Sequence, residues 1–569
     1  MNRITTQFRR KLHISPEVSQ TETRFVDQEV DHEIESILVK LVKPKPDTST
    51  MTTQTSSLYR NWGIPATTSL LPLQSPLENF TPFEYYSKYN SSKSLIDNPR
   101  LSVTKMLTLS WCELKQYYEI FSGSPYVEPT PSMSLGTKVH SQLERDIHPH
   151  IETTNIEDLL LQNFKEILKI TQDEEQVRVN TLKQLVYGHK EVNEMGKAWA
   201  DEIISRLFTL NTTGEAREVL VHGYLDFENE RFITDIDQLP QSDEHNKVLV
   251  SGVVDSLKLA EKPTTTWEDK SSTIDLNEFL ESTNNQETSL ILSDIKTRTF
   301  NSVPYQDSIL DSAKLQTFYY KHMFEVLTHD VGFSYNSLLT NAQKKGIDID
   351  KPLSAIAVLN ILRTNYRLFF QDFMKLSQGE PIGFPEFDNI TPSDIPYEFG
   401  KVFQLSDEFS WDHPNHTKFL ERLNQIDPEV NYSEILLPLL TTWKTPPTIR
   451  YFAARASQFY GLFKSNSMPQ TSVEYVNNSS GETINTMSYN YNHEELAESI
   501  HQSCSFWQGN RNPIPTEYVS RCKYCVFKDK CVVPNGGITS HEKSRMELVE
   551  DFLQECELET VEEVNSRQS

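Results

Sequence analysis

The sequence predicts an α/β protein with a small mixed sheet packed against helices. Two observations predict it: apolar residues first recur at helical spacing and then at strand spacing, and the order is helices, three strands and a helix. No stretch approaches the ~20 apolar residues of a membrane span, which excludes an integral membrane protein. With 569 residues, the chain can form about two to four domains without a disulfide scaffold.

The chain is acidic, with 54 basic and 80 acidic residues and a formal net charge of −26. This balance excludes a generally cationic, histone-like binder. It leaves room for a local basic groove, because binding depends on local potential while net charge governs long-range behaviour. The hydrophobic fraction of 37% and the 29 prolines indicate that part of the chain is loop or disordered.

The amino terminus is basic, since Arg3, Arg9, Arg10 and Lys11 all precede the first acidic residue, Glu17. We interpret residues 1–30 as a mitochondrial targeting segment; an ordinary basic tail is the alternative. Residues 31–95 contain Lys-Pro repeats and a Ser/Thr cluster, which predict a poorly ordered linker.

The regular elements are expected to begin near Leu101. The spacing of apolar residues predicts helices at about 101–121, 134–147, 156–172 and 178–210, strands at 218–222, 248–254 and 290–296, and a helix at 311–328. These elements make a core at 96–330, interrupted by a polar insertion at 260–288. Residues 331–500 are expected to be mainly helical, and 501–569 to form a metal-binding segment with an acidic tail.

Three of the six cysteines, Cys522, Cys525 and Cys531, form a C-x2-C-x5-C motif in which a tight loop lets two thiolates reach one metal centre. The neighbouring basic residues favour thiolate over thiol. A fourth ligand is needed, and the candidates are Cys112, Cys504 and Cys556. These residues alone support zinc as well as an iron–sulfur cluster. A ligand at Cys112 would join the beginning of the folded region to its end.

Two carboxylates lie on the predicted strands. Asp255 ends the second strand, in Gly252-Val-Val-Asp255, and Asp294 shares a face of the third strand with Lys296. If the strands are neighbours, the carboxylates converge and repel each other, and a divalent cation relieves this repulsion. Oxygen ligands suit magnesium or manganese.

Two predicted helices add polar residues at i,i+4 spacing. One carries Gly136 and His140, and the other carries Gln316 and Tyr320. Each pair alone is more often an ordinary structural feature. The combination of both pairs with the carboxylates, in this order along the chain, is what indicates a functional site.

In this order the motifs resemble the exonuclease V family, within the RecB-like branch of the PD-(D/E)xK nucleases. The residues that carry the resemblance are Gly136/His140, Gly252/Asp255, Asp294/Lys296 and Gln316/Tyr320. The layout of one cysteine before the core and three after it is similar to the iron–sulfur members of this branch. Two departures are Asp294, where Glu is common in relatives, and the insertion between Asp255 and Asp294.

The resemblance implies a restriction-endonuclease-like fold with helical additions, stapled by a 4Fe–4S cluster on Cys112, Cys522, Cys525 and Cys531. It implies Mg²⁺ or Mn²⁺ on Asp255, Asp294 and His140, with Lys296 positioning or activating water. Gln316 would orient Lys296 or the phosphate, and Tyr320 would stack or contact the DNA backbone.

The implied activity is a 5′-directed exonuclease on single-stranded DNA in mitochondrial DNA replication, recombination or repair. We expect a monomer, with a single-strand-binding protein as a candidate partner. The residues considered for contact with DNA are Arg298, Tyr319 and Lys321, and further along the chain Arg450, Tyr451, Phe452 and Arg455. The alternatives are a non-catalytic DNA-binding protein with a nuclease fold and a zinc-stapled interaction protein.

Overall fold

The computed structural model describes residues 80–90, 100–122, 131–148, 189–240, 246–261, 273–283, 289–390 and 442–528, with isolated positions between them and Cys531. All of these lie in one compact unit, Thr53–Ser569. The predicted targeting segment, most of the predicted linker, the helix at 156–172, the acidic tail and Cys556 lie outside the described residues. No described helix is both long and apolar enough to cross a membrane.

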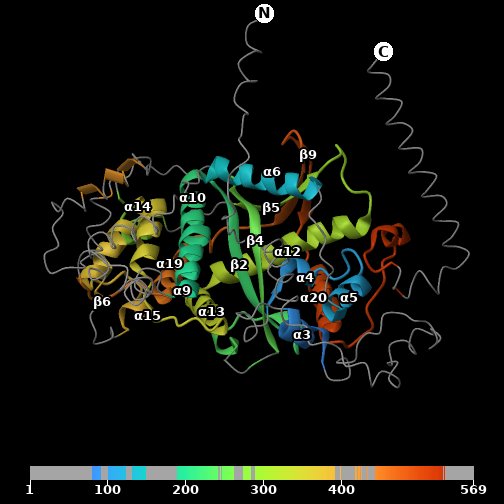
Figure 1. Cartoon of the computed structure of the whole chain (residues 1–569), viewed down its shortest axis with the longest axis horizontal. Helices are drawn as coiled ribbons and strands as arrows, with labels where there is room; N and C mark the ends of the chain where they lie inside the picture. Colours follow the sequence, from blue (N-terminus) through green and yellow to red (C-terminus); the bar gives the residue numbers. More distant parts are fainter. Residues whose placement is uncertain are drawn as a thin grey trace, which may run out of the picture. The chain divides into compact units, whose positions relative to one another are not determined.

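A seven-stranded mixed sheet forms the centre of this unit (Figure 1). Its order is β3-β2-β4-β5-β8-β9, with β1 paired to β4. The strands are β1 (Arg100–Ser102), β2 (Glu215–Asp226), β3 (Arg231–Phe232), β4 (Lys247–Leu259), β5 (Leu290–Arg298), β8 (Gln470–Asn477) and β9 (Thr483–Asn490). The pairs β1–β4 and β5–β8 are parallel and the others are antiparallel. The predicted α/β class with a mixed sheet is confirmed, and all three predicted strands are present.

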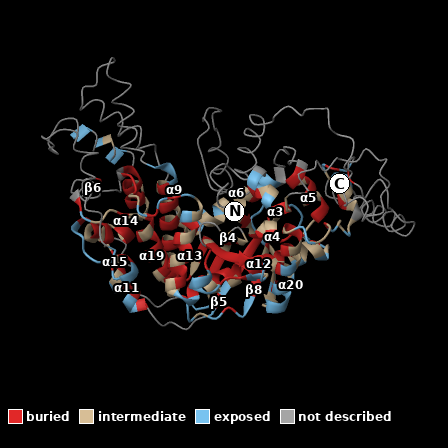
Figure 2. Ribbon diagram, turned by 90° about the horizontal axis from the view of Figure 1, so that it is seen from below, coloured by how far each residue is buried: buried red, intermediate tan, exposed pale blue. Residues whose placement is uncertain are grey.

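Helices pack around this sheet, and buried residues concentrate along the sheet and along α12, α13 and α19 (Figure 2). The longer helices are α6 (Pro131–Ile147), α9 (Lys190–Trp199), α10 (Arg206–Thr213), α12 (Asp307–His329), α13 (Val331–Lys344), α14 (Ala355–Gln378), α19 (Ile449–Gly461) and α20 (His493–Trp507). A π-helical segment, Ala200–Ser205, joins α9 to α10. The helices predicted at 134–147 and 311–328 correspond to α6 and α12.

The helix predicted at 101–121 is wrong in its first half. Leu101 pairs with Val250 in the parallel β1–β4 ladder, and Ser102 then caps the short helix α4 (Val103–Met106) by accepting a hydrogen bond from the backbone of Lys105. Leu107 leaves helical geometry, and α5 (Glu113–Ser122) begins only after a turn. The apolar spacing spans both helices, so the periodicity did not reveal the break.

The polar insertion predicted at 260–288 is also wrong in part. Its second half contains α11 (Leu276–Thr283), whose Leu276 and Phe279 are fully buried. The ring of Phe279 stacks on Phe459 of α19 at a centroid distance of 5.9 Å. This part of the insertion therefore belongs to the core.

Residues 331–500 are largely helical where they are described, but they also supply β8 and β9. Ser293 of β5 and Ser472 of β8 are hydrogen-bonded at 2.6 Å, and Thr317 of α12 bonds Thr471 at 2.7 Å. One buried cluster extends from Phe83 to Trp507. The 331–500 region is thus built into the same sheet and core as the residues before it.

The described end of the predicted linker is ordered as well. A capping box on Thr81 starts α3 (Pro82–Tyr85), and Phe83 is buried against Phe227 and Trp507. Residues 80–85 therefore hold α20 against the start of the folded region, which corrects the linker prediction for this stretch.

A buried ion pair joins α14 to α19. Arg455 and Asp372 are both fully buried, and the guanidinium donates to both carboxylate oxygens at 2.6 and 2.7 Å. The hydroxyl of Tyr451 donates to the same carboxylate at 2.8 Å. Phe452 is fully buried, and Arg450 is paired with Asp350. We therefore exclude these α19 residues from the DNA-contacting set considered above.

We expect Asp372→Ala to lower the free energy of unfolding by about 3–5 kcal/mol, because it leaves the Arg455 charge buried and unpaired. The double variant Asp372→Leu/Arg455→Met removes both charges and should recover most of this loss. Urea unfolding curves measure both effects, and equal losses in the single and double variants would contradict the argument.

Candidate active site

The predicted carboxylates meet where β4 and β5 separate. The antiparallel pairing runs from Leu259↔Leu290 to Ser256↔Ser293 and then stops, so Asp255 and Asp294 are the next residues in register. Asp255 Oδ2 accepts a hydrogen bond from the backbone N–H of Ile295 at 2.6 Å. The inserted residues therefore do not keep the two strands apart, and the expected convergence is present.

A chain of polar side chains leads from the second carboxylate into α12. Lys296 Nζ lies 3.0 Å from Asp294 Oδ2 and donates to Gln316 Oε1 at 2.9 Å. Gln316 Nε2 in turn donates to the hydroxyl of Tyr320 at 2.8 Å. Because Gln316 and Tyr320 are buried, this chain holds the Lys296 ammonium in one position beside Asp294.

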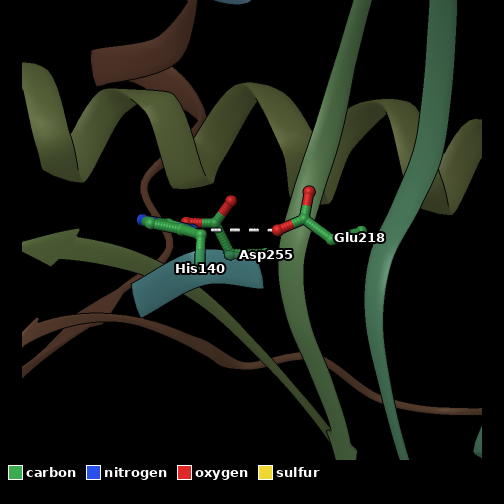
Figure 3. Close-up of side chains that lie close together, drawn as sticks. All are labelled: His140, Glu218 and Asp255. Carbon is green, nitrogen blue, oxygen red and sulfur yellow. Dashed lines mark ion pairs between the residues drawn. The ribbon is translucent and has the colours of Figure 1, made fainter. Parts of the chain in front are cut away.

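On the other side of Asp255 lies an acidic residue that the sequence reasoning missed. Glu218 of β2, Asp255 and His140 of α6 each offer a ligand atom, and these atoms lie within 4.8 Å of one another. Figure 3 shows the three side chains pointing toward one another, with His140 Nδ1 3.7 Å from Glu218 Oε1.

The position of Glu218 depends on pairing that the sequence does not show. The β2–β4 register places it opposite Asp255, between the pairs Arg217↔Ser256 and Val219↔Val254. Its φ of 53° lies in the left-handed region that non-glycine residues seldom adopt, at a cost of about 1–3 kcal/mol. Two carboxylates placed opposite each other on neighbouring strands repel, so this arrangement favours a bound cation.

Burial and charge shift the proton affinities of the site. Burial raises the pKa of Asp294 to about 6, although the Lys296 charge opposes this shift. Burial also raises the pKa of Asp255. Burial lowers the pKa of His140, but its hydrogen bond to Glu218 and the charges of Asp255, Glu218 and Asp294 outweigh this and raise the value to about 9. Although burial opposes it, Asp294 and Asp255 hold the pKa of Lys296 above its usual value.

Two glycines of the predicted motifs allow the helices to approach the sheet. A Cβ on Gly252 would clash with the ring of Tyr320, and a Cβ on Gly136 would lie 2.6 Å from Oγ1 of Thr297 in β5. These glycines are therefore required for close approach: the first admits Tyr320 against β4, and the second brings α6, with His140, up to β5.

The cysteines of the motif lie together with Cys112. All four, Cys112, Cys522, Cys525 and Cys531, line one small cavity. Beside it, the buried Arg521 donates to the backbone oxygens of Ser110 and Trp111 and to the side chain of Gln306. Of the other two candidate ligands, Cys504 is fully buried in the core and Cys556 lies outside the described residues.

The residues considered for DNA contact differ in their placement. Arg298 follows Lys296 on the same face of β5 and is partly exposed. Tyr319 is fully buried and Lys321 is 4% exposed, with its ammonium held by Glu325 at 2.6 Å. Neither Tyr319 nor Lys321 offers a surface to a nucleic acid, and we leave both out of the proposed interface.

The donor set fits a divalent cation. The carboxylates of Glu218 and Asp255 and the imidazole of His140 form a group of the size that one metal ion needs, and the buried carboxylate of Asp294 lies on the neighbouring strand β5, paired with Lys296. A protonated lysine stands beside the carboxylates. This is the arrangement of a hydrolase that acts on an anionic, phosphate-containing substrate.

Comparison with known proteins gives the family. Residues 96–532 match the family model "Exonuclease V - a 5' deoxyribonuclease". Proteins named "Exonuclease V, mitochondrial" are similar over most of their length: one from Candida albicans is 42% identical, covering 88% of this chain and 82% of its own. Another, from Scheffersomyces stipitis, is 38% identical, and the match covers 87% of this chain and 93% of the relative. The chain belongs to the exonuclease V family and is a mitochondrial member of it, as predicted.

The raised pKa of His140 can be tested in metal-free protein through the pH dependence of its stability. Its folded value of about 9 exceeds the unfolded value of about 6.5, so its contribution to stability is complete below pH 6.5 and is lost as pH rises through 9. His140→Ala should therefore cost about 1–2 kcal/mol more at pH 6 than at pH 9.5, after discounting for solvent screening. Urea unfolding in a chelator measures this difference, and a cost independent of pH would refute the assignment.

Proposed function

We propose that this protein is a divalent-metal-dependent exonuclease that hydrolyses phosphodiester bonds of single-stranded DNA in mitochondria. The observation that carries the proposal is the meeting of Asp255, Asp294 and Lys296 at the point where β4 and β5 part. The family description supports DNA as the substrate and attack from the 5′ end. The same meeting of motifs supports a PD-(D/E)xK core for the sheet.

Asp255, Asp294, His140 and Glu218 would hold the cation. When bound, Mg²⁺ or Mn²⁺ supplies polarisation of the scissile phosphate and lowers the pKa of a bound water. Glu218 adds a ligand that the sequence motifs did not include, and His140 must lose its proton to bind a metal.

Lys296 contributes charge rather than a proton-accepting lone pair, because its pKa is held above the ordinary value and it stays protonated. Its Nζ can donate to a non-bridging phosphate oxygen or to the attacking water, and so stabilise the negative charge that develops during hydrolysis. Gln316 Oε1 accepts a hydrogen bond from the Lys296 ammonium, and Gln316 Nε2 donates one to the hydroxyl of Tyr320. We therefore assign Gln316 the orientation of Lys296, and Tyr320 the orientation of Gln316.

We also propose a 4Fe–4S cluster on Cys112, Cys522, Cys525 and Cys531, with a structural role. The four cysteines line one cavity, which supports a shared metal centre there. The layout of one cysteine before the core and three after it, which is similar to that of the iron–sulfur nucleases, supports a cluster rather than a single zinc ion. The cluster would join the segment before α5 to the chain beyond α20.

Asp294→Ala should abolish Mg²⁺-dependent shortening of end-labelled single-stranded DNA, with a loss of about 10³-fold or more. Label placed at each end in turn reports polarity. The exposed Ile236→Ala is the matched control and should cut at the parental rate. Unchanged cleavage by Asp294→Ala would remove the active-site assignment, and intact DNA with the parent would instead indicate a non-catalytic DNA-binding protein.

Cys112→Ser should lower the bound iron and the brown absorbance of anaerobically purified protein, and should reduce thermal stability, because the two ends of the folded region lose their covalent link through the metal. Cys504→Ala serves as the control for iron content, since Cys504 lies in the core and does not line the cysteine cavity. Iron content that survives in Cys112→Ser would contradict the ligand set.

The monomeric state of the protein and its binding to a single-strand-binding protein stay predictions.

A further inference from the structure

Two aromatic side chains project into solvent from the loop that follows the catalytic strand. The loop, residues 299–306, joins β5, which carries Asp294 and Lys296, to α12, which carries Gln316. Phe300 is 69% exposed and Tyr305 is 70% exposed. A single exposed aromatic residue is unremarkable, but two on one short loop beside a substrate site call for a physical reason.

The start of this loop is tied to the turn after β8. Asn477 Nδ2 donates to Asn301 Oδ1 at 2.6 Å, and Asn478 Nδ2 donates to Thr299 Oγ1 at 3.3 Å. The residues on either side of Phe300 are therefore anchored by side chains from a distant part of the chain.

The middle and the end of the loop are also anchored. Val303 packs on the buried cluster of Ala313, Val473 and Tyr475, and Pro304 is buried. Gln306 accepts hydrogen bonds from Arg521, next to the cysteine cavity. The inward residues thus hold the loop in place, while its two aromatic residues face outward.

Phe300 follows directly after the strand that carries the catalytic side chains. Asp294, Lys296 and Arg298 lie on one face of β5, and Phe300 comes two residues after the last residue of this strand, where the chain bends. Arg298 lies between Lys296 and Phe300 along the chain, and its buried Nε has no hydrogen-bond partner in the described structure. A nucleic-acid strand leaving the carboxylates in this direction would pass a cation and then the aromatic loop.

We propose that Phe300 and Tyr305 stack against bases of the single strand whose phosphate lies at Asp294 and Lys296. The inference rests on the proposed function and gives a physical source for the preference for single strands. Every unpaired base offers a face for stacking whatever its sequence, whereas the bases inside a duplex are already stacked. Stacking also adds affinity that an acidic protein with a net charge of −26 does not obtain from long-range attraction.

Binding is measured with the full chain carrying Asp294→Ala, which keeps the DNA intact, and a fluorescein-labelled single-stranded oligonucleotide. Adding Phe300→Ala or Tyr305→Ala should weaken binding about tenfold each, while Tyr305→Trp and Phe300→Tyr keep it, because stacking needs an aromatic face. Ile236→Ala, also exposed, is the control and should bind like its parent. Thermal melting points should match that of the parent, since neither side chain is buried.

Strands with one abasic position separate stacking from other contacts. In the Asp294→Ala protein, removing the base that stacks on Tyr305 should weaken binding. When Tyr305→Ala is also present, removing the same base should cause no further loss of affinity. Equal abasic penalties in parent and variants, or full affinity in both alanine variants, would overturn the proposal. The unmodified protein is tested for cleavage in parallel. If it leaves DNA intact while the abasic penalty depends on Tyr305, the proposed nuclease activity is wrong and the stacking proposal holds. If the unmodified protein cleaves DNA but the abasic penalty is the same with and without the Tyr305 side chain, only the stacking proposal is wrong.

Discussion

Repulsion among carboxylates governs the architecture of the site. Asp255 is flanked by Glu218 on β2 and by Asp294 on β5, and two cations, His140 and Lys296, partly balance the three acids. Such a cluster costs free energy unless the surrounding structure holds it, and a divalent cation would relieve the cost. The surrounding features serve this purpose: β4 and β5 stop pairing just before the carboxylates, and α6 and α12 approach over Gly136 and Gly252.

The second organising element is the end of the chain that returns to its beginning. Cys112 and the C-x2-C-x5-C motif line one cavity, and Arg521 bonds the backbone before α5 and the residue preceding α12. Because α12 carries Gln316 and Tyr320, the cysteine segment and the active site share one helix as support. The hydrogen bonds of Arg521 thus connect the cysteine-lined cavity to the start of α12.

The sequence predicted the site better than it predicted the surrounding fold. His140, Asp255, Asp294, Lys296, Gln316 and Tyr320 come together as the motif order implied, since each lies at a fixed spacing on an element with a strong local pattern. The residues whose placement the sequence did not predict are those whose surroundings come from segments far away in the sequence. Glu218 faces the site through the β2–β4 register and an unusual φ, and Tyr319 and Lys321 are covered by α20 and its neighbours.

By itself, then, the sequence determined the α/β class, the three central strands, the family and most of the residues that meet at the candidate site, because alternation, helical spacing and short motifs are local properties. Only the tertiary structure decided that β8 and β9 complete the sheet, that α11 is part of the core, and that Arg455 is a buried partner of Asp372. It also decided which aromatic residues face solvent. These outcomes depend on pairing and packing between segments far apart in the chain, whose energies no local pattern records.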